Sequence, residues 1–142
     1  MNKKDGVFNI IKKNSEAISK EVTKGKSLNS RKGKKGELEA ALYLSKEGYE
    51  IVEVNYNICN FEIDIICKDK DTYVFVEVKY KTSKKYGMGF EEVNKNKQKK
   101  IISCAKLYMR ASNLNSNSKI RFDIVSIDEG KVMHIKNAFS DI

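Results

Sequence analysis

The fold of this chain is decided by two neighbouring stretches: residues 61–67, Phe61-Glu62-Ile63-Asp64-Ile65-Ile66-Cys67, and residues 73–79, Tyr73-Val74-Phe75-Val76-Glu77-Val78-Lys79. The short charged turn between them predicts an antiparallel hairpin. Side chains alternate along a strand, so the second stretch is apolar on both faces, as expected at the centre of a sheet. Charges at the end of such a strand are costly unless they are paired or bind a metal. Asp64, Glu77 and Lys79 therefore indicate a metal-dependent phosphodiesterase site.

The remaining pattern predicts an α/β fold with a mixed central sheet flanked by helices. The expected elements are a helix over Glu37–Lys46, a strand over Tyr49–Tyr56, a helix over Glu91–Ala111, a strand over Ile120–Ile127 and a short strand over Val132–Ile135. The long helix between the third and fourth strands permits their parallel pairing. Its apolar stripe, extended one turn backward from Ile102, points Gln98 inward. Lys81–Phe90 is expected to be a mobile loop.

Charge divides the 142 residues into two parts. Residues 1–36 hold 11 Lys and Arg against 3 Asp and Glu, which leaves +8, and residues 37–142 hold 17 against 16, which leaves +1 of the total of +9. We predict a basic leader over residues 1–32, made of an amphipathic helix and a flexible linker, and one compact α/β domain over residues 33–142.

Several classes of protein are disfavoured. No apolar run approaches the roughly 20 residues needed to span a bilayer, and the first residues do not resemble a signal peptide. Three cysteines without C-x-x-C spacing argue against a disulfide framework or a zinc site and favour the cytoplasm. His134, the only histidine, is expected to be an ordinary surface or edge residue.

Oxygen ligands of the kind that Mg²⁺ prefers are present in the hairpin. Asp64 and Glu77, with the carbonyl of Val78, form a plausible ligand set, and Lys79 shares a strand face with Glu77. The alternative is a cross-strand ion pair at a sheet edge. Glu37 alone is explained as an acid favoured at a helix N-terminus, and Glu62 as a supporting or surface acid.

A basic segment follows this acidic site. Lys79 to Arg110 holds 10 basic residues and, as acids, only Glu91 and Glu92. Such a segment suits a polyanion held beside a metal site, although charge runs are commonly solvated helix faces. The candidate nucleic-acid-binding residues, from the leader's end through this segment, are Lys34, Lys35, Lys81, Lys84, Lys85, Lys97, Lys99 and Lys100.

These residues carry a resemblance to a known family. The matching pieces span about residues 33–128 and include Gly36-Glu37, Glu62-Ile63-Asp64-Ile65-Ile66, Val74-Phe75-Val76-Glu77-Val78-Lys79, Tyr86-Gly87, Lys97-Gln98 and Arg121-Phe122-Asp123. The chain resembles the YraN-like family of bacterial predicted endonucleases, which is similar to archaeal Holliday junction resolvases within the PD-(D/E)xK nuclease superfamily. The resemblance implies a restriction-endonuclease-like core. It makes Asp64 and Glu77 metal ligands, Lys79 the catalytic lysine, and Glu37 and Gln98 further active-site residues.

The chain also departs from this family's pattern. Phe61 replaces a usual glycine, arginines expected near Asn57 and Cys59 are absent, and Lys81 stands where the family has arginine. Arg grips phosphate bidentately and Lys does not, so substrate binding is the part that these departures affect.

Three functions are compatible with the sequence. The first is a Mg²⁺-dependent endonuclease, with Mn²⁺ as a substitute, that acts on DNA at branched or damaged structures; symmetric cutting of two strands would need a homodimer. The second is a nucleic-acid-binding module that keeps the nuclease fold without useful cleavage. The third is a scaffold whose leader helix mediates self-association or docking.

Overall fold

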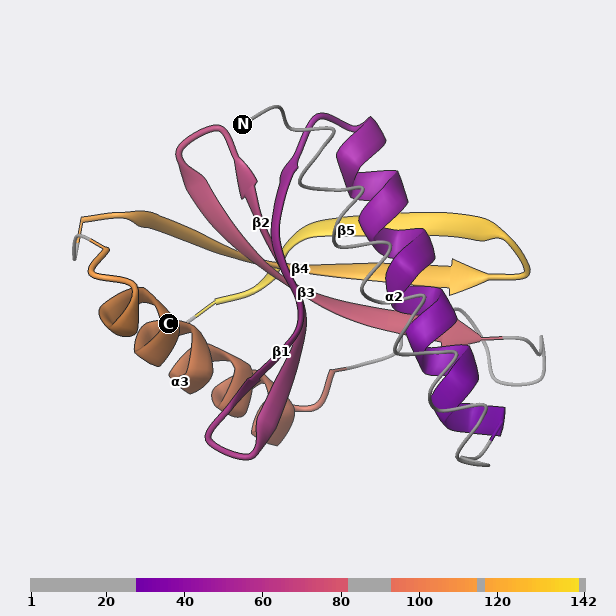
Figure 1. Ribbon diagram of the computed structural model, residues 1–142, viewed down its shortest axis with the longest axis horizontal. Helices are drawn as coiled ribbons and strands as arrows, with labels where there is room; N and C mark the ends of the chain where they lie inside the picture. Colours follow the sequence, from indigo (N-terminus) through magenta and orange to yellow (C-terminus); the bar gives the residue numbers. More distant parts are fainter. Residues whose placement is uncertain (1–27, 82–92, 115–116, 141–142) are drawn as a thin grey trace.

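In the part of the chain that the structure describes, a five-stranded sheet carries one helix on each face (Figure 1). The computed structural model describes residues 28–81, 93–114 and 117–140, without the side chains of residues 28–34 and 81. The elements, in chain order, are α2 (Leu28–Lys46), β1 (Glu50–Ile58), β2 (Phe61–Asp69), β3 (Thr72–Lys81), α3 (Lys95–Ala111), β4 (Lys119–Asp128) and β5 (Lys131–Phe139). The predicted leader helix and most of the predicted loop over Lys81–Phe90 lie outside the described residues.

The strand order is β1-β2-β3-β4-β5, with β3 and β4 parallel and every other pair antiparallel. This confirms the mixed sheet, the β2–β3 hairpin and the parallel crossover through α3. The fold is consistent with a restriction-endonuclease-like core. Each strand extends beyond its predicted C-terminal end, because ladder pairing continues past the apolar residues into the charged turns, whereas β1 begins at Glu50, one residue after its predicted start.

The core has two layers, one on each face of the sheet. Ala40, Ala41 and Leu44 of α2 pack on Val74 and Val76 of β3. On the opposite face the buried side of α3 packs on Phe75 and Phe122. Since β3 is apolar toward both layers, its central position in the sheet follows directly from its alternating side chains.

Helix α2 is longer than predicted. It begins at Leu28, whereas the sequence favoured Glu37 as the start and a flexible linker before it. Gly36 permits this course, because a Cβ at this position would lie 2.7 Å from Cβ of Tyr80 on β3. Gly36 is therefore a point of close approach between α2 and β3, and packing outweighs its low helix propensity.

Helix α3 begins later than predicted, at Lys95 rather than Glu91. Asn94 is the N-cap, and its side-chain oxygen accepts a hydrogen bond of 2.9 Å from the backbone N–H of Lys97. The predicted apolar stripe is confirmed, since all of its residues are buried: Ile101, Ile102, Ala105, Tyr108 and Met109. A polar N-cap thus sets a boundary that the apolar periodicity did not reveal.

His134 is not a surface residue, although it lies on the edge strand β5. Its side chain is 5% exposed, and its Nε2 lies 2.7 Å from Oδ2 of the fully buried Asp123. Arg121 donates to both oxygens of Asp123 at 2.9 Å and to Asp69 at 3.0 Å. These partners hold the pKa of Asp123 below its usual value even though burial alone would raise it. The network ties β2, β4 and β5 together.

Within the described ranges, no helix is both long and apolar enough to cross a membrane.

Candidate active site

The candidate site lies where β2 and β3 separate. Their regular pairing ends at Ile65 and Val76, one residue before Asp64 and Glu77. Oδ2 of Asp64 instead accepts a hydrogen bond of 2.8 Å from the backbone N–H of Val78. A carboxylate thus takes the place of a ladder carbonyl and occupies the opening between the two strands.

The backbone on both sides of this opening is irregular. Ile63 belongs to the core beneath α3, whereas Ile65, two residues later, belongs to the core beneath α2. In a regular strand both would face the same layer. The facing residue on β1, between the strand pairs Val54–Ile65 and Tyr56–Ile63, is Asn55, which has a φ of 55°. The strand changes face between Ile63 and Ile65, and the Asp64 carboxylate between them lies in the opening, within 4.8 Å of an oxygen of Glu37 on α2.

Val78 is also turned toward this opening. Because the N–H and C=O of one strand residue point to the same neighbouring strand, the Val78 carbonyl faces the side from which Asp64 accepts the N–H. The expectation that this carbonyl lies beside the carboxylates therefore agrees with the local backbone geometry.

Three carboxylates gather at the opening from two elements. One oxygen each from Glu37, Glu62 and Asp64 lie within 4.8 Å of one another. Glu37 is the tenth residue of α2 and is only 9% exposed, so a helix N-terminus does not account for it. Packing of α2 against β3 carries this acid onto the sheet beside Asp64.

A fourth carboxylate, Glu77, lies on the α3 side of the opening. Its side chain is 5% exposed, and its Oε1 accepts a hydrogen bond from Nζ of Lys97 on α3. Nζ of Lys79 lies 3.8 Å from the same oxygen. Strand alternation had placed Lys79 beside Glu77, and the structure confirms that placement. Lys97, predicted as a nucleic-acid-binding residue, instead contacts an acidic side chain of the site.

The electrostatics of the cluster centre on Asp64. Burial first, then the charges of Glu77 and Glu37, raise the pKa of Asp64 well above its usual value, against the lowering effect of the Val78 N–H. Burial and the nearby Lys97 ammonium lower the pKa of Lys79. Burial lowers the pKa of Lys97, but its hydrogen bond to Glu77 outweighs this and leaves it raised.

The donor set fits a hard divalent cation. Four carboxylates and two lysines leave a formal charge of −2 when all six groups are ionised, which a divalent cation would balance. Every side-chain ligand atom is a carboxylate oxygen, the type that Mg²⁺ and Mn²⁺ prefer. The crowding of carboxylates adds to burial, the larger cause, in raising the pKa of Asp64.

Gln98 is half-buried at the start of α3, as predicted. Its Nε2 donates a hydrogen bond of 2.7 Å to the carbonyl of Val93, the residue before the N-cap. This donor is used to hold the segment that enters α3. Gln98 thereby positions the helix turn that carries Lys97.

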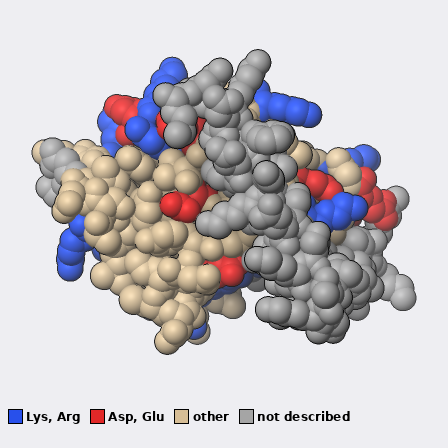
Figure 2. Space-filling view, in the orientation of Figure 1, with Lys and Arg blue, Asp and Glu red and all other residues tan. Residues whose placement is uncertain are grey.

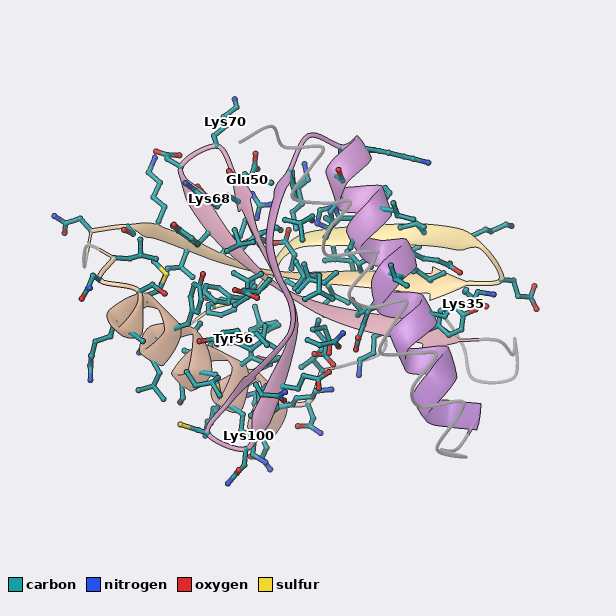
Figure 3. All side chains as sticks on the ribbon, in the orientation of Figure 1. Lys35, Glu50, Tyr56, Lys68, Lys70 and Lys100 are labelled. Carbon is teal, nitrogen blue, oxygen red and sulfur yellow. The ribbon has the colours of Figure 1, made fainter. Side chains whose placement is uncertain are left out.

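The predicted basic residues do not form one continuous surface among the described side chains. Lys99 and Lys100 are exposed on α3, and Lys35 is exposed on α2. Figure 3 shows Lys35 and Lys100 far apart. On the face seen in Figure 2, basic side chains lie near the rim, and acidic ones lie both beside them at the rim and toward the middle. Lys81 ends β3, while Lys84, Lys85 and the side chain of Lys34 lie outside the described part.

Sequence reasoning missed one contact and undervalued one acid. The apolar stripe of α3, extended four residues back from Ile101, reaches Lys97, so the signal for an inward lysine was present. Glu62 was assigned a supporting or surface role, yet it is one of the three closest carboxylates. The available signal was strand alternation, which places Glu62 and Asp64, on either side of Ile63, on the same face.

Comparison with known proteins gives a consistent family match. Residues 36–127 match the model of the uncharacterised protein family UPF0102. Similar proteins include a UPF0102 protein of Clostridioides difficile (strain 630), 44% identical over 113 residues, which are 78% of this chain and 98% of the relative. Another, from Persephonella marina, is 44% identical over 108 residues (76% and 92%), and one from Syntrophus aciditrophicus is 46% identical over 116 residues (78% and 90%).

Proposed function

Since this chain belongs to the UPF0102 family, the YraN-like family expected from its motifs, and gathers four carboxylates and two lysines in one cluster, we propose that it is a metal-dependent endonuclease hydrolysing DNA phosphodiester bonds. The observation that carries this proposal is the Asp64 carboxylate inserted between β2 and β3. A buried, crowded acid that replaces a ladder bond is costly, and such groups are concentrated at functional sites.

In this proposal Asp64, Glu77 and the carbonyl of Val78 hold Mg²⁺ or Mn²⁺, and Glu37 and Glu62 complete the acidic wall. A divalent cation supplies charge stabilisation for phosphoryl oxygens when it is bound. The chain's own contribution is to keep these oxygens converged before substrate arrives, which removes the cost of ordering them during the reaction.

Lys79 and Glu37 have separate roles in this mechanism. The Lys79 ammonium donates to a non-bridging phosphoryl oxygen, where negative charge increases as water attacks. Its lowered pKa also makes proton transfer at Nζ less costly than for an exposed lysine. Glu37, held on α2 across the opening, accepts a proton from the attacking water. Packing of α2 on β3 fixes the two elements that carry Glu37 and Lys79 relative to each other.

The proposed substrate is DNA, with branched or damaged structures as preferred sites, and the proposed location is the cytoplasm. The basic leader, with a charge of +8 over residues 1–36, and the exposed Lys99 and Lys100 provide attraction to phosphates. Symmetric cutting of two strands would require a homodimer with a two-fold axis.

A second candidate is a nucleic-acid-binding module without useful cleavage. One contact favours it: Lys97 already neutralises Glu77, as a lysine would in a site that works without a divalent cation. Titration with Mn²⁺ separates the two functions. Absence of Mn²⁺ binding at Asp64 and Glu77 would favour the binding module.

The deciding experiment compares Asp64→Ala and Lys79→Ala with two control variants, Glu50→Ala and Lys70→Ala. Both controls change exposed residues at the end of the molecule opposite Lys100 (Figure 3). Each protein is assayed with linear, single-stranded, flap and four-way DNA at varied Mg²⁺ and Mn²⁺. We expect the two site variants to lose cleavage while DNA affinity changes little, and the controls to keep both. Cleavage that survives in Asp64→Ala and Lys79→Ala would rule out this active site.

A further inference from the structure

A pocket of about 440 Å³ opens between the β1–β2 turn and the outer side of α3. Its wall includes Cys59 and Phe61 from the turn and Lys99, Lys100, Cys104 and Leu107 from the helix. The volume falls in the range of small-ligand pockets. None of the carboxylates of the active site lines it, so it is a separate feature of the molecule.

The floor of the pocket is apolar and anchored. Phe61 is half-buried and packs on the core beneath α3. Cys104 is 5% exposed, and its Sγ lies 3.9 Å from the carbonyl of Ile58. Leu107 is 37% exposed, which leaves apolar surface open to solvent beside two lysines. An apolar surface bordered by ammonium groups is complementary to a ligand that is aromatic and anionic.

The turn that forms one wall has an uncommon backbone. Its two central residues, Cys59 and Asn60, have φ of 51° and 60°, and the flanking Ile58 and Phe61 are paired. This is the geometry of a tight hairpin turn, which favours asparagine and glycine. Cysteine tolerates it less well. Lys70 and Glu129, in the other two hairpin turns, also have positive φ, so this conformation shapes the wall of the pocket and is not itself a sign of a ligand.

The pocket also lies close to the active site. Phe61 precedes Asp64 by three strand residues, which span about 10 Å. Lys100 follows Lys97, the partner of Glu77, by three helical residues, or roughly one turn. Figure 3 shows Lys100 beside the β1–β2 turn. One strand of a duplex advances about 3.4 Å per nucleotide, so the pocket lies within about three nucleotides of the carboxylates.

We propose that this pocket binds an unpaired nucleobase of the DNA substrate, with the base against Phe61 and the adjoining phosphates on Lys99 and Lys100. A paired base inside a duplex cannot enter a recess of this kind, and a base that is already unpaired enters at least cost. Aromatic side chains stack on any base, so the recognition is of structure rather than of sequence. Ser103 and Asn60, which also line the pocket, offer hydrogen bonds to base edges.

This inference rests on the proposed function, because it specifies which DNA the nuclease prefers. It also explains two departures from the family pattern. Phe61 stands where a glycine is usual, and Cys59 lies near an expected arginine. Both residues line this one pocket.

The test measures binding in EDTA, so that cleavage plays no part. The probes are a duplex with one bulged 2-aminopurine and the same duplex fully paired, titrated with the full-length protein. We expect the bulged duplex to bind about tenfold more tightly and its fluorescence to fall on binding. Phe61→Leu, which keeps apolar volume but removes the ring, should lose most of this preference, and Phe61→Trp should retain it.

Ile120→Ala is the control, because Ile120 is an exposed apolar residue on β4 and is not among those lining the pocket. Equal affinity for the two duplexes, or an equal loss on both with Phe61→Leu, would overturn the inference. Cleavage assays on the same proteins distinguish the two proposals. A bulge preference without metal-dependent cleavage contradicts only the nuclease function, and cleavage without a bulge preference contradicts only the base pocket.

Discussion

Replacement of Lys97 by methionine should tighten divalent-metal binding. The Lys97 ammonium bonds to Glu77, a proposed metal ligand, so a cation that uses this oxygen must displace it. Methionine keeps most of the side chain's length and apolar contact but removes the charge. The variant cluster then holds four carboxylates against Lys79 alone, and its formal charge changes from −2 to −3.

The size of the effect follows from the contact that is removed. A hydrogen bond between charged groups is worth about 1.5–3 kcal/mol. The Lys97 side chain is 37% exposed, so water screens part of this, and about 1.4 kcal/mol is a reasonable share. That difference corresponds to roughly a tenfold lower dissociation constant for Mn²⁺. The contact with Glu77 therefore makes Lys97 a competitor of the metal.

Isothermal titration calorimetry with Mn²⁺, at pH 8 and without nucleic acid, measures this constant directly. Lys95→Met is the matched control, because Lys95 is exposed on the same helix and its loss changes the net charge equally. We expect less than about a twofold change for the control. An unchanged or weaker Mn²⁺ affinity in Lys97→Met, with an intact thermal transition, would refute the displacement of Lys97 by metal.

Three further predictions concern stability. Burial, and then the charges of Glu77 and Glu37, raise the pKa of Asp64, so the stabilisation linked to this group is present at low pH and lost as pH rises through the raised pKa. Metal-free Asp64→Asn should therefore be more stable than the wild type by about 0.5–2 kcal/mol at pH 8 and gain little at pH 3, as measured by thermal melts. Gly36→Ala should cost about 1–3 kcal/mol in urea unfolding because its Cβ meets Cβ, Cγ and Cδ2 of Tyr80, and Tyr80→Gly, which removes all three atoms, should relieve the clash in the double variant. Asp123→Asn should lower the free energy of unfolding by about 3–5 kcal/mol at pH 7, because it leaves the largely buried Arg121 without its main partner. The loss should be smaller at pH 2, because the stability that a lowered aspartate pKa provides is lost as pH falls through that pKa.

The order and type of the described elements could be predicted from local sequence because they depend on periodicity. Alternation in β3 identified a central strand, and the 3.6-residue stripe identified the buried face of α3. Boundaries were less predictable. The start of α2 depends on how Gly36 meets Tyr80, and the start of α3 depends on the Asn94 cap. Both are contacts with particular partners rather than properties of a repeating pattern.

The candidate site was predicted in part for the same reason. Glu77 and Lys79 share a face through strand alternation, and the hairpin brings Asp64 alongside them. His134 was misjudged because its burial depends on Asp123, a residue on the neighbouring strand that only pairing brings near. The residues around His134 correctly predict an edge strand, but they do not reveal the buried carboxylate of Asp123 on the neighbouring strand.

The sequence by itself determined the mixed sheet, the hairpin and the acid-acid-lysine set, because strand and helix periodicities act over a few residues. Only the tertiary structure decided how that set is completed. Glu37 reaches it from α2, nearly thirty residues earlier, and Lys97 reaches it from α3, twenty residues after Glu77. Their positions depend on how two helices pack on opposite faces of one sheet. The free energy of that packing is spread over both core layers, so a local pattern can show that Lys97 faces inward but not that its ammonium meets Glu77.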